Sequence, residues 1–428
     1  MLPMISLLKW IPVCPILFLA LSAIPGVAGA DNVIGDFTPT PAVLPTPSVT
    51  VSSDQLPPAN ALPKNWVGEK IYTFDTLFGT KGAGLNEING PEGICVGPDD
   101  NLYIADTQNN RIQVWTCDGQ PVKSIGSYGP SAVWRNDPQF DHPAGVLVLP
   151  NGQMYVADTL NNRVVMLDPD GLVLTAWGSM GTRHRQFTQP REVTKDHYGN
   201  IWVLDSGNSR ISNFTNTGKY NYTFGTLGTG SGQMNLPLGM ALNNTDQCIV
   251  ADTGNFRIVV FNDQSPSHID QSPVTTDSGT VTMEPTPIDN SPVTIEGWYG
   301  DGPFQFKEPA GVCMTKTGGI VVADGLSGRV ELFNGRFEFL GQWKASDDNV
   351  SLASPPRFRG VACDSKNRLY VTDIQNNCII RLKLIKVEKP LLDQFGIAVA
   401  VETPEPTPSP TPTPDDSVPY GGAGFPIR

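Results

Sequence analysis

Six aspartates that recur at a regular spacing are the residues of this sequence best placed to do chemistry. In five of the six copies an arginine follows the aspartate after five positions, usually with an asparagine between them. The aspartates could be catalytic, or a carboxylate and a guanidinium at this spacing could form a charge-assisted pair. Because the pattern recurs so often, we expect a structural turn rather than six catalytic sites. The repeated residues are Asp106, Arg111, Asp158, Arg163, Asp205, Arg210, Asp252, Arg257, Asp324, Arg329 and Asp373.

Motifs for nucleophilic catalysis or structural zinc are missing from the sequence. No Cys-x-x-Cys pair occurs, and no Gly-x-Ser-x-Gly or phosphate-binding glycine-rich loop lies in a strand-to-helix setting. Six cysteines follow residue 30, an even number that permits disulfides in an exported chain. Cys95 and Cys313 occupy the same position in two repeats, where small apolar residues belong, so free buried thiols are the alternative.

The segments that must position these residues are also repeated. Residues 145–177 divide into four short runs rich in β-branched or aromatic residues, at 145–149, 154–157, 163–167 and 172–177. Gly, Asn, Asp or Pro bounds each run, which indicates strands joined by turns. Units of this kind follow one another every 47 to 52 residues, apart from one step of 72. The pattern predicts an all-β propeller of six four-stranded antiparallel blades, whose strands we name a to d from the axis outward.

The sequence resembles the NHL-repeat family of β-propellers. The resemblance rests on Pro-x-Gly-(Ile/Val) followed by Tyr-(Ile/Val)-Ala-Asp-x-x-Asn-x-Arg-(Ile/Val), and it covers roughly residues 66–387. Glu192 replaces the Gly of the third copy, Ser327 the Asn of the fifth and Cys378 the Arg of the sixth. The last blade is therefore expected to lack the pair that this Arg would make.

A propeller has to join its first and last blades, because open sheet edges invite further pairing. The sixth unit supplies only strands a to c and ends near Leu384. The segment before the first unit reads like the strand d segments that end at Gly178 and Gly225. We therefore predict that residues 66–79 form the outer strand of the last blade.

The N-terminal residues 1–30 have the layout of a secretory signal. Lys9 precedes an apolar stretch, and small residues lead up to Ala30. An uncleaved membrane anchor is the alternative, and contact with a membrane is expected only in that case. The signal predicts a secreted or cell-surface protein.

Composition divides the rest of the chain. Residues 31–65 are rich in Pro and Thr and predict a disordered spacer, and residues 389–428 end in a similar tail with added acidic residues. The propeller is expected over residues 66–388. An insertion at residues 263–294, between strands c and d of the fourth blade, explains the step of 72.

The net charge of −13 limits the choice of partner. A protein this acidic repels the phosphate backbone of nucleic acids. Some NHL-repeat proteins bind RNA through a basic face, but this charge balance does not support that role here. We expect a protein, peptide or glycan as partner and no nucleic acid.

The resemblance also directs attention to the mouth of the central channel, where propellers meet ligands. Related amidating lyases hold a metal there with several histidines, and lactonase-type propellers use acidic and amide groups around calcium. Only His142 stands at a strand a entrance, which is too few for a three-histidine zinc site. Glu92 and Glu192 could flank calcium or another divalent cation, but Arg191 and Arg359 oppose this. We therefore predict no metal and no cofactor.

The loops that lead from strand d to the next strand a carry aromatic and basic residues, the types enriched at binding hot spots. Because successive strands alternate in direction, these loops share a face with the Asp-x-x-Asn-x-Arg turns, opposite the insertion. Packing against neighbouring blades is the alternative role of the tryptophans. The candidate binding residues are Trp134, Arg135, Arg183, His184, Arg185, Trp298 and Tyr299.

Together the repeats, the export signal and the scarcity of metal ligands predict a non-catalytic binding or scaffold module outside the cell. The alternative is a metal-dependent enzyme of the lyase or lactonase type with a divalent cation in the channel.

Overall fold

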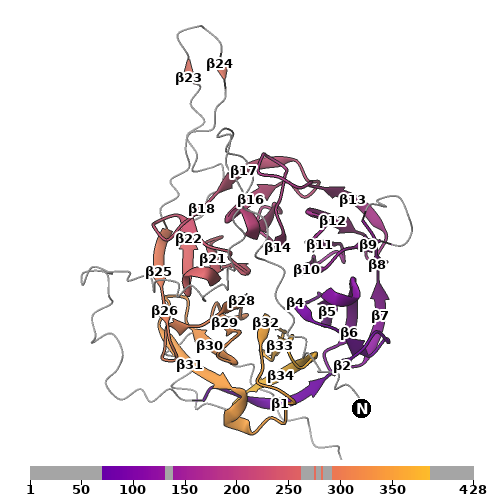
Figure 1. The fold of residues 1–428 in the computed structure, drawn as a ribbon, viewed down its shortest axis with the longest axis vertical. Helices are drawn as coiled ribbons and strands as arrows, with labels where there is room; N and C mark the ends of the chain where they lie inside the picture. The colour runs from indigo at the N-terminus through magenta and orange to yellow at the C-terminus, as the bar shows by residue number, and fades with distance from the viewer. Residues whose placement is uncertain (1–69, 131–137, 262–273, 276–280, 283–291, 386–428) are drawn as a thin grey trace, which may run out of the picture. The chain divides into compact units, whose positions relative to one another are not determined.

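The structure is a computed structural model that describes residues 70–130, 138–261, 274–275, 281–282 and 292–385. In these residues six four-stranded antiparallel sheets stand around a central axis, as Figure 1 shows. The predicted six-bladed propeller is confirmed. Among the described residues, no helix has the length and apolar character that crossing a membrane requires.

Each blade keeps its strands in sequence order from the axis outward, except the last. Blade 1 is β4 (Pro91–Val96), β5 (Asn101–Asp106), β6 (Arg111–Thr116) and β7 (Pro121–Ile125); blade 2 is β10 (Pro143–Val148), β11 (Met154–Asp158), β12 (Arg163–Leu167) and β13 (Val173–Trp177); blade 3 is β14 (Pro190–Lys195), β15 (Ile201–Asp205), β16 (Arg210–Phe214) and β17 (Tyr220–Phe224). Blade 4 is β20 (Gly239–Leu242), β21 (Cys248–Asp252), β22 (Arg257–Phe261) and β25 (Pro292–Glu296); blade 5 is β28 (Pro309–Met314), β29 (Ile320–Asp324), β30 (Arg329–Phe333) and β31 (Phe339–Lys344); blade 6 is β32 (Phe358–Cys363), β33 (Leu369–Asp373), β34 (Cys378–Leu384) and β1 (Tyr72–Phe78).

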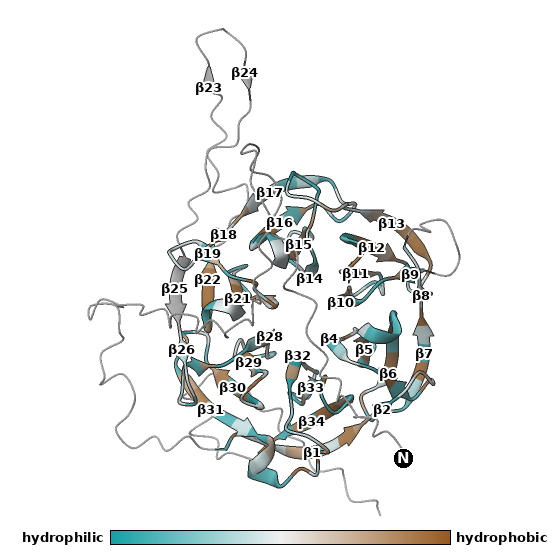
Figure 2. Cartoon of the chain, in the orientation of Figure 1, coloured by the Kyte–Doolittle hydropathy of each residue, from teal (hydrophilic) through white to brown (hydrophobic). Residues whose placement is uncertain are grey.

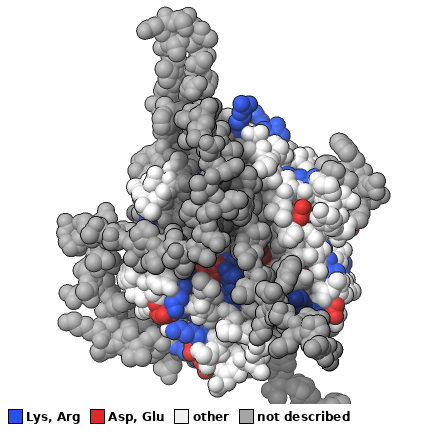
Figure 3. Space-filling view, in the orientation of Figure 1, with Lys and Arg blue, Asp and Glu red and all other residues white. Residues whose placement is uncertain are grey.

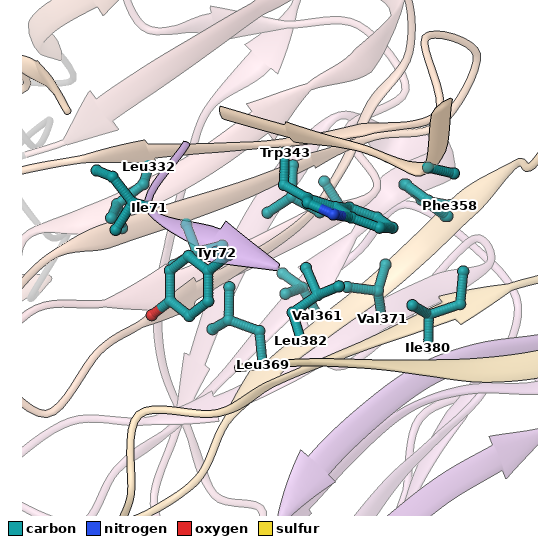
Figure 4. Close-up of a cluster of buried hydrophobic side chains, with 14 of the residues drawn as sticks. Ile71, Tyr72, Leu332, Trp343, Phe358, Val361, Leu369, Val371, Ile380 and Leu382 are labelled. Atoms are coloured by element: carbon teal, nitrogen blue, oxygen red, sulfur yellow. The ribbon is translucent and has the colours of Figure 1, made fainter. Parts of the chain in front are cut away.

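The ring closes as predicted, with β1 as the outer strand of blade 6. It pairs antiparallel with β34, from Tyr72 opposite Leu384 to Phe78 opposite Ile379, and the two strands lie side by side in Figure 1. Figure 4 shows Tyr72 packed in a hydrophobic cluster formed by blades 5 and 6. The chain therefore joins its first described strand to its last blade by both hydrogen bonds and apolar contact.

Hydrophobic side chains fill the spaces between neighbouring blades, not the axis. In the described residues, each of six buried clusters joins two adjacent sheets; one of them links Tyr155 and Val164 of blade 2 to Val203 and Phe214 of blade 3. Figure 2 shows hydrophobic residues in the strands and hydrophilic ones in many of the loops. This arrangement leaves the axis free for a channel lined by strands a.

The Gly of the Pro-x-Gly motif lets the inner strands approach one another. A Cβ on Gly239 would lie 2.0 Å from the carbonyl oxygen of Ala310, and one on Gly360 would lie 2.4 Å from that of Glu92. Gly93, Gly145 and Gly311 meet the next blade in the same way. Blade 3 is the exception, because Glu192 stands at this position.

The insertion in blade 4 ends earlier than predicted. Strand β25 begins at Pro292, so it includes the last three residues of the segment expected to form the insertion. Within the insertion, β23 (Val274–Thr275) pairs antiparallel with β24 (Val281–Thr282). The predicted signal at 1–30, the spacer at 31–65 and the C-terminal segment at 389–428 lie outside the described residues.

Candidate functional site

The Asp-x-x-Asn-x-Arg motif ties the turn between strands b and c to the neighbouring loop. In blade 4 the fully buried Asp252 accepts hydrogen bonds from the Asn235 backbone N–H at 2.6 Å, Asn255 Nδ2 at 2.8 Å and Arg257 Nε at 2.7 Å. Arg257 Nη1 then donates to the Thr229 carbonyl at 2.7 Å. The Arg Nε to Asp Oδ2 contact measures 2.7 to 2.8 Å in blades 1 to 3. In these four blades the aspartate, asparagine and arginine side chains of the motif all make hydrogen bonds within the propeller.

The motif asparagine is not the left-handed residue of this turn. The left-handed conformation belongs to the residue after it, such as Asn110 with φ 57° or Phe256 with φ 58°. The asparagine itself ends a short 3₁₀ turn, as Asn109 does in η2 (Thr107–Asn109), and its side chain donates to the aspartate. Its role is therefore to satisfy the buried carboxylate.

Blades 5 and 6 depart from the motif, and their aspartates have different partners. In blade 5 Arg329 Nη2 lies 2.8 Å from Glu331 Oε1 and 3.3 Å from Asp324 Oδ2. In blade 6, where Cys378 replaces the arginine, Asp373 still accepts from Asn376 Nδ2 at 2.6 Å. The last blade lacks the arginine of the motif, and the Asn376 side-chain amide still satisfies its aspartate.

The loops from strand d to the next strand a, called d–a loops below, lie on the same face as these turns. The arginine bonds show this directly, since Arg111 and Arg210 donate to carbonyls of the d–a loops at Ala83 and Thr182. We call this surface the d–a face. Four d–a loops contain parallel strand pairs: β2 (Thr80–Lys81) with β3 (Glu87–Ile88), β8 (Ser127–Tyr128) with β9 (Gln139–Phe140), β18 (Thr226–Leu227) with β19 (Gln233–Met234), and β26 (Trp298–Tyr299) with β27 (Gln305–Phe306).

One position of these loops exposes a large apolar side chain in blade after blade. Tyr128, Met180, Leu227 and Tyr299 are 66%, 69%, 67% and 61% exposed, and we call them the apolar ring. Each is the third residue of a Gly-x-x-Gly tetrapeptide. A further tetrapeptide of this kind precedes blade 1 and has Lys81 at the third position. Sequence reasoning missed Met180 and Leu227, although the repeated tetrapeptide was a signal that could have found them.

Five of the seven predicted binding residues are described by the structure, and all five are exposed on this face. Trp298 and Tyr299 form β26 and are exposed, and Phe256 packs edge-on against Tyr299 with ring centroids 5.1 Å apart. Arg183, His184 and Arg185 are exposed beside an open hollow of the loop before blade 3. Trp134 and Arg135 lie outside the described residues.

The four residues predicted at the channel mouth do come together. Glu92, Arg191, Glu192 and Arg359 line a small cavity of about 20 Å³ at the start of strands a. Glu92 forms an ion pair with Arg191 across the channel, and Figure 3 shows acidic and basic atoms side by side near the centre of the propeller. Arg359 Nη1 lies 2.9 Å from Oε1 of Glu308, a carboxylate that sequence reasoning did not place here.

The pKa values of the two glutamates at the mouth are shifted in opposite directions. Burial favours the neutral form of both, but Arg191 and Arg359 hold the pKa of Glu92 below its ordinary value. Glu192 has no such cation partner, and burial raises its pKa to about 8. A neutral Glu192 and an arginine-paired Glu92 make a poor calcium site. Within the described part of the chain, no three His, Cys, Asp or Glu side chains are grouped to hold a metal ion.

Beyond the mouth, strands a line a cavity of about 240 Å³ that is open to solvent. Cys95, Cys313 and Cys363 contribute to its wall, and all six cysteines from Cys95 to Cys378 are free thiols. Burial raises the pKa of Cys95 and of Cys363 to about 12. These thiols are therefore protonated at neutral pH and behave as small apolar groups.

Comparison with known proteins finds the same repeat. The NHL repeat model matches residues 89–115 and 234–261. NHL repeat-containing protein 3 of Mus musculus is 32% identical over 119 residues, which are 26% of this chain and 34% of that protein, and its Homo sapiens counterpart is 31% identical over the same shares. The matched part spans about a third of the length of these relatives.

Solved structures that align with this chain are more distant in sequence. A gluconolactonase from Xanthomonas campestris aligns with a TM-score of 0.48 and 15% identity, over 74% of this chain and 98% of the other. A streptogramin B lyase aligns with a TM-score of 0.47 and 13% identity, over 74% and 98%.

Proposed function

Because this chain is an NHL-repeat β-propeller, we propose that it is an exported, non-catalytic binding module that docks a folded protein partner on its d–a face. The observation that carries this proposal is the apolar ring of Tyr128, Met180, Leu227 and Tyr299. Large apolar side chains that are exposed at equivalent positions of successive loops, all on one face, are a surface that a protein partner could cover.

The placement of the ring favours a protein over the smaller ligands. Its members come from the loops that precede blades 2, 3, 4 and 5, so a partner that touches all of them has to extend across several blades. Met180 and Leu227 offer no flat ring on which a sugar could stack, whereas both suit the apolar centre of a protein interface. A short peptide or glycan could contact only part of this surface.

Charge on the same face indicates the character of the partner. Lys81, Arg183 and Arg185 are exposed in d–a loops, whereas Asp301 is paired with Lys307 at 2.7 Å. Within the described part of the chain no ion pair engages Lys81, Arg183 or Arg185, so the face offers basic groups on a protein whose net charge is −13. A partner surface with apolar residues surrounded by acidic ones would match it, and electrostatic attraction would speed the encounter.

A comparison of two multiple variants tests this proposal. The face variant replaces Tyr128, Met180, Leu227 and Tyr299 by Ser, and the control variant replaces the exposed Leu77, Val122 and Leu174 of strands d by Ser. Each protein is immobilised and exposed to the culture medium and surface extract of its own cell, and bound proteins are identified and their affinity measured.

We expect wild type and control to retain the same partner, and the face variant to bind it at least about tenfold more weakly, since hot-spot residues contribute more than about 1 kcal/mol each. Hydrogen exchange in the complex should be slowed in the d–a loops. Equal binding by the three proteins, or protection only on the opposite face, would rule out this surface.

A further inference from the structure

Four asparagines of the propeller have the sequence that N-linked glycosylation requires, Asn-x-Ser or Asn-x-Thr with x other than proline. They are Asn213, Asn221, Asn243 and Asn349, and the structure describes all four. So short a triplet often arises by chance. Because a glycan is bulky and belongs on a surface loop, exposure and hydrogen bonding have to show which of the four side-chain amides an enzyme can reach.

Two of these asparagines lie in blade 3 and bond to each other. Asn213 is fully buried in β16, and its Oδ1 accepts a hydrogen bond of 2.7 Å from Nδ2 of Asn221 in β17. The Nδ2 of Asn213 is also buried. One of the two amide nitrogens therefore lies inside the propeller and the other is directed at a buried side chain, so neither is accessible once the protein has folded.

Asn243 holds the turn between β20 and β21. Its Oδ1 accepts hydrogen bonds from the backbone N–H groups of Thr245 and Gln247 at 3.0 and 2.9 Å, and from the Thr245 hydroxyl at 2.9 Å. Its Nδ2 donates to Gln247 Oε1 at 2.8 Å. The asparagine thus shapes the turn, and both polar side chains of this triplet are already engaged.

Asn349 differs from the other three in both respects. It is exposed in the d–a loop between blades 5 and 6, where it follows η6 (Ala345–Asp348) in the left-handed conformation with φ 52°. Within the described part of the chain, no hydrogen bond engages its side-chain amide or the hydroxyl of Ser351, which is exposed as well. The Val350 N–H donates to the Ala345 carbonyl at 3.2 Å. A fixed turn therefore presents the amide and the hydroxyl of this triplet to solvent.

The residues that precede each triplet also single out Asn349. Some oligosaccharyl transferases read the triplet alone, and others require in addition an acidic residue two positions before the asparagine. Asp347 meets this requirement and is exposed, whereas Ile211, Lys219 and Ala241 hold that position before the other three triplets. Both classes of enzyme would therefore select the same residue on the folded propeller.

We propose that Asn349 is an N-glycosylation site and that the other three asparagines stay unmodified. The donor is an oligosaccharide linked to a lipid through a diphosphate. Nδ2 of Asn349 attacks C1 of the first sugar, the bond between C1 and the phosphate oxygen breaks, and the lipid diphosphate leaves with the electron pair. Nδ2 loses one proton to a base of the transferase. Glycosylation at Asn349 depends on the export that the proposed function includes, because these transferases act on exported chains.

A glycan at Asn349 would not modify the apolar ring. The ring comes from the loops before blades 2 to 5, whereas Asn349 belongs to the loop before blade 6. The adjacent Asp348 fastens this loop to β1, because its carboxylate accepts a hydrogen bond of 2.7 Å from the Phe74 backbone N–H. The modification is therefore attached where the propeller closes and alters no side chain of the proposed partner site.

The protein purified from the medium and surface of its own cell tests this proposal. Peptide mass spectrometry, with a fragmentation method that keeps the glycan attached, assigns it to a residue. We expect a glycan on the peptide that contains Asn349 and none at Asn213, Asn221 or Asn243. An exported protein with an unmodified Asn349, or with a glycan on any of the other three, would overturn the proposal. A protein found only inside the cell would instead refute export, and the glycan with it.

Three substitutions at exposed positions identify the acceptor. Asn349→Gln should abolish the modification, and so should Ser351→Ala, which keeps the asparagine and its left-handed backbone. Ser351→Thr is the matched control, because it keeps the hydroxyl and should be modified like the wild type. A glycan that persists in Ser351→Ala would contradict N-linked transfer to Asn349. Partner binding by all three variants should match that of the wild type, so a failure of the docking proposal would appear in a different measurement.

Discussion

The closure of the ring depends on Asp348, a residue of the short 3₁₀ turn η6 (Ala345–Asp348) after blade 5. Its carboxylate accepts hydrogen bonds from the Phe74 backbone N–H and from Trp343 Nε1, both at 2.7 Å, and forms an ion pair with Lys70. It therefore links the closing strand β1 to blade 5, in addition to the pairing of β1 with β34. Figure 4 shows Trp343 among the side chains of the apolar cluster between blades 5 and 6.

Asp348→Ala should destabilise the propeller by about 3 kcal/mol. Truncation leaves two N–H donors without an acceptor, at about 1–3 kcal/mol each. The pair with the partly exposed Lys70 adds at most about 1 kcal/mol. Urea unfolding followed by tryptophan fluorescence measures the change, since Trp343 is almost fully buried. Asp347→Ala is the matched control, because among the described residues this exposed neighbour accepts a single hydrogen bond, from the Lys344 backbone, and its loss should cost under about 1 kcal/mol.

The difference between wild type and Asp348→Ala should depend on pH in one direction. Burial alone would raise the pKa of Asp348, but hydrogen bonds from Lys70, Phe74 and Trp343 lower it to about 2. A lowered carboxylate pKa stabilises the fold above the unfolded value near 3.8, and this contribution is lost as the pH falls through 2. If Asp348→Ala and Asp347→Ala had the same stability at pH 7, our account of ring closure would be wrong.

Three further predictions concern the channel and its wall. Gly239→Ala should destabilise the fold by about 3 kcal/mol or more in urea unfolding, because the added Cβ would lie 2.0 Å from the Ala310 carbonyl oxygen. Gly335→Ala is the milder comparison and should cost much less, because its Cβ would lie 3.3 Å from the Gly318 carbonyl oxygen. Because the pKa of Glu192 is raised, the wild type should lose stability as the pH rises from 4.5 through 8, so Glu192→Gln should be the more stable protein at pH 9 and equal to the wild type at pH 4. Protein purified without reductant and unfolded in urea should react with a thiol reagent at Cys95, Cys117, Cys248, Cys313, Cys363 and Cys378, and native protein should react far more slowly; protection that persists in urea would indicate disulfides.

The amino-acid sequence by itself determined the architecture of this protein. Strand-length apolar runs between turn residues recur at a fixed period, and local strand pairing follows directly from such a pattern. The missing fourth strand of the last unit and the strand-like segment before the first were enough to predict that β1 closes blade 6. The sequence also indicated that the aspartates and their arginines belong to turns. A motif that recurs once in every blade is typical of a structural role.

Only the tertiary structure decided how residues from different blades meet at the axis. Glu92 and Arg191 are 99 residues apart, and Glu308 and Arg357 are 49 apart, so no local pattern could show which arginine meets which carboxylate. The same holds for the pKa of Glu192, which depends on burial by neighbouring strands. Sequence periodicity encodes contacts within a blade, whereas charge balance and burial in the channel arise only when all six blades surround one axis.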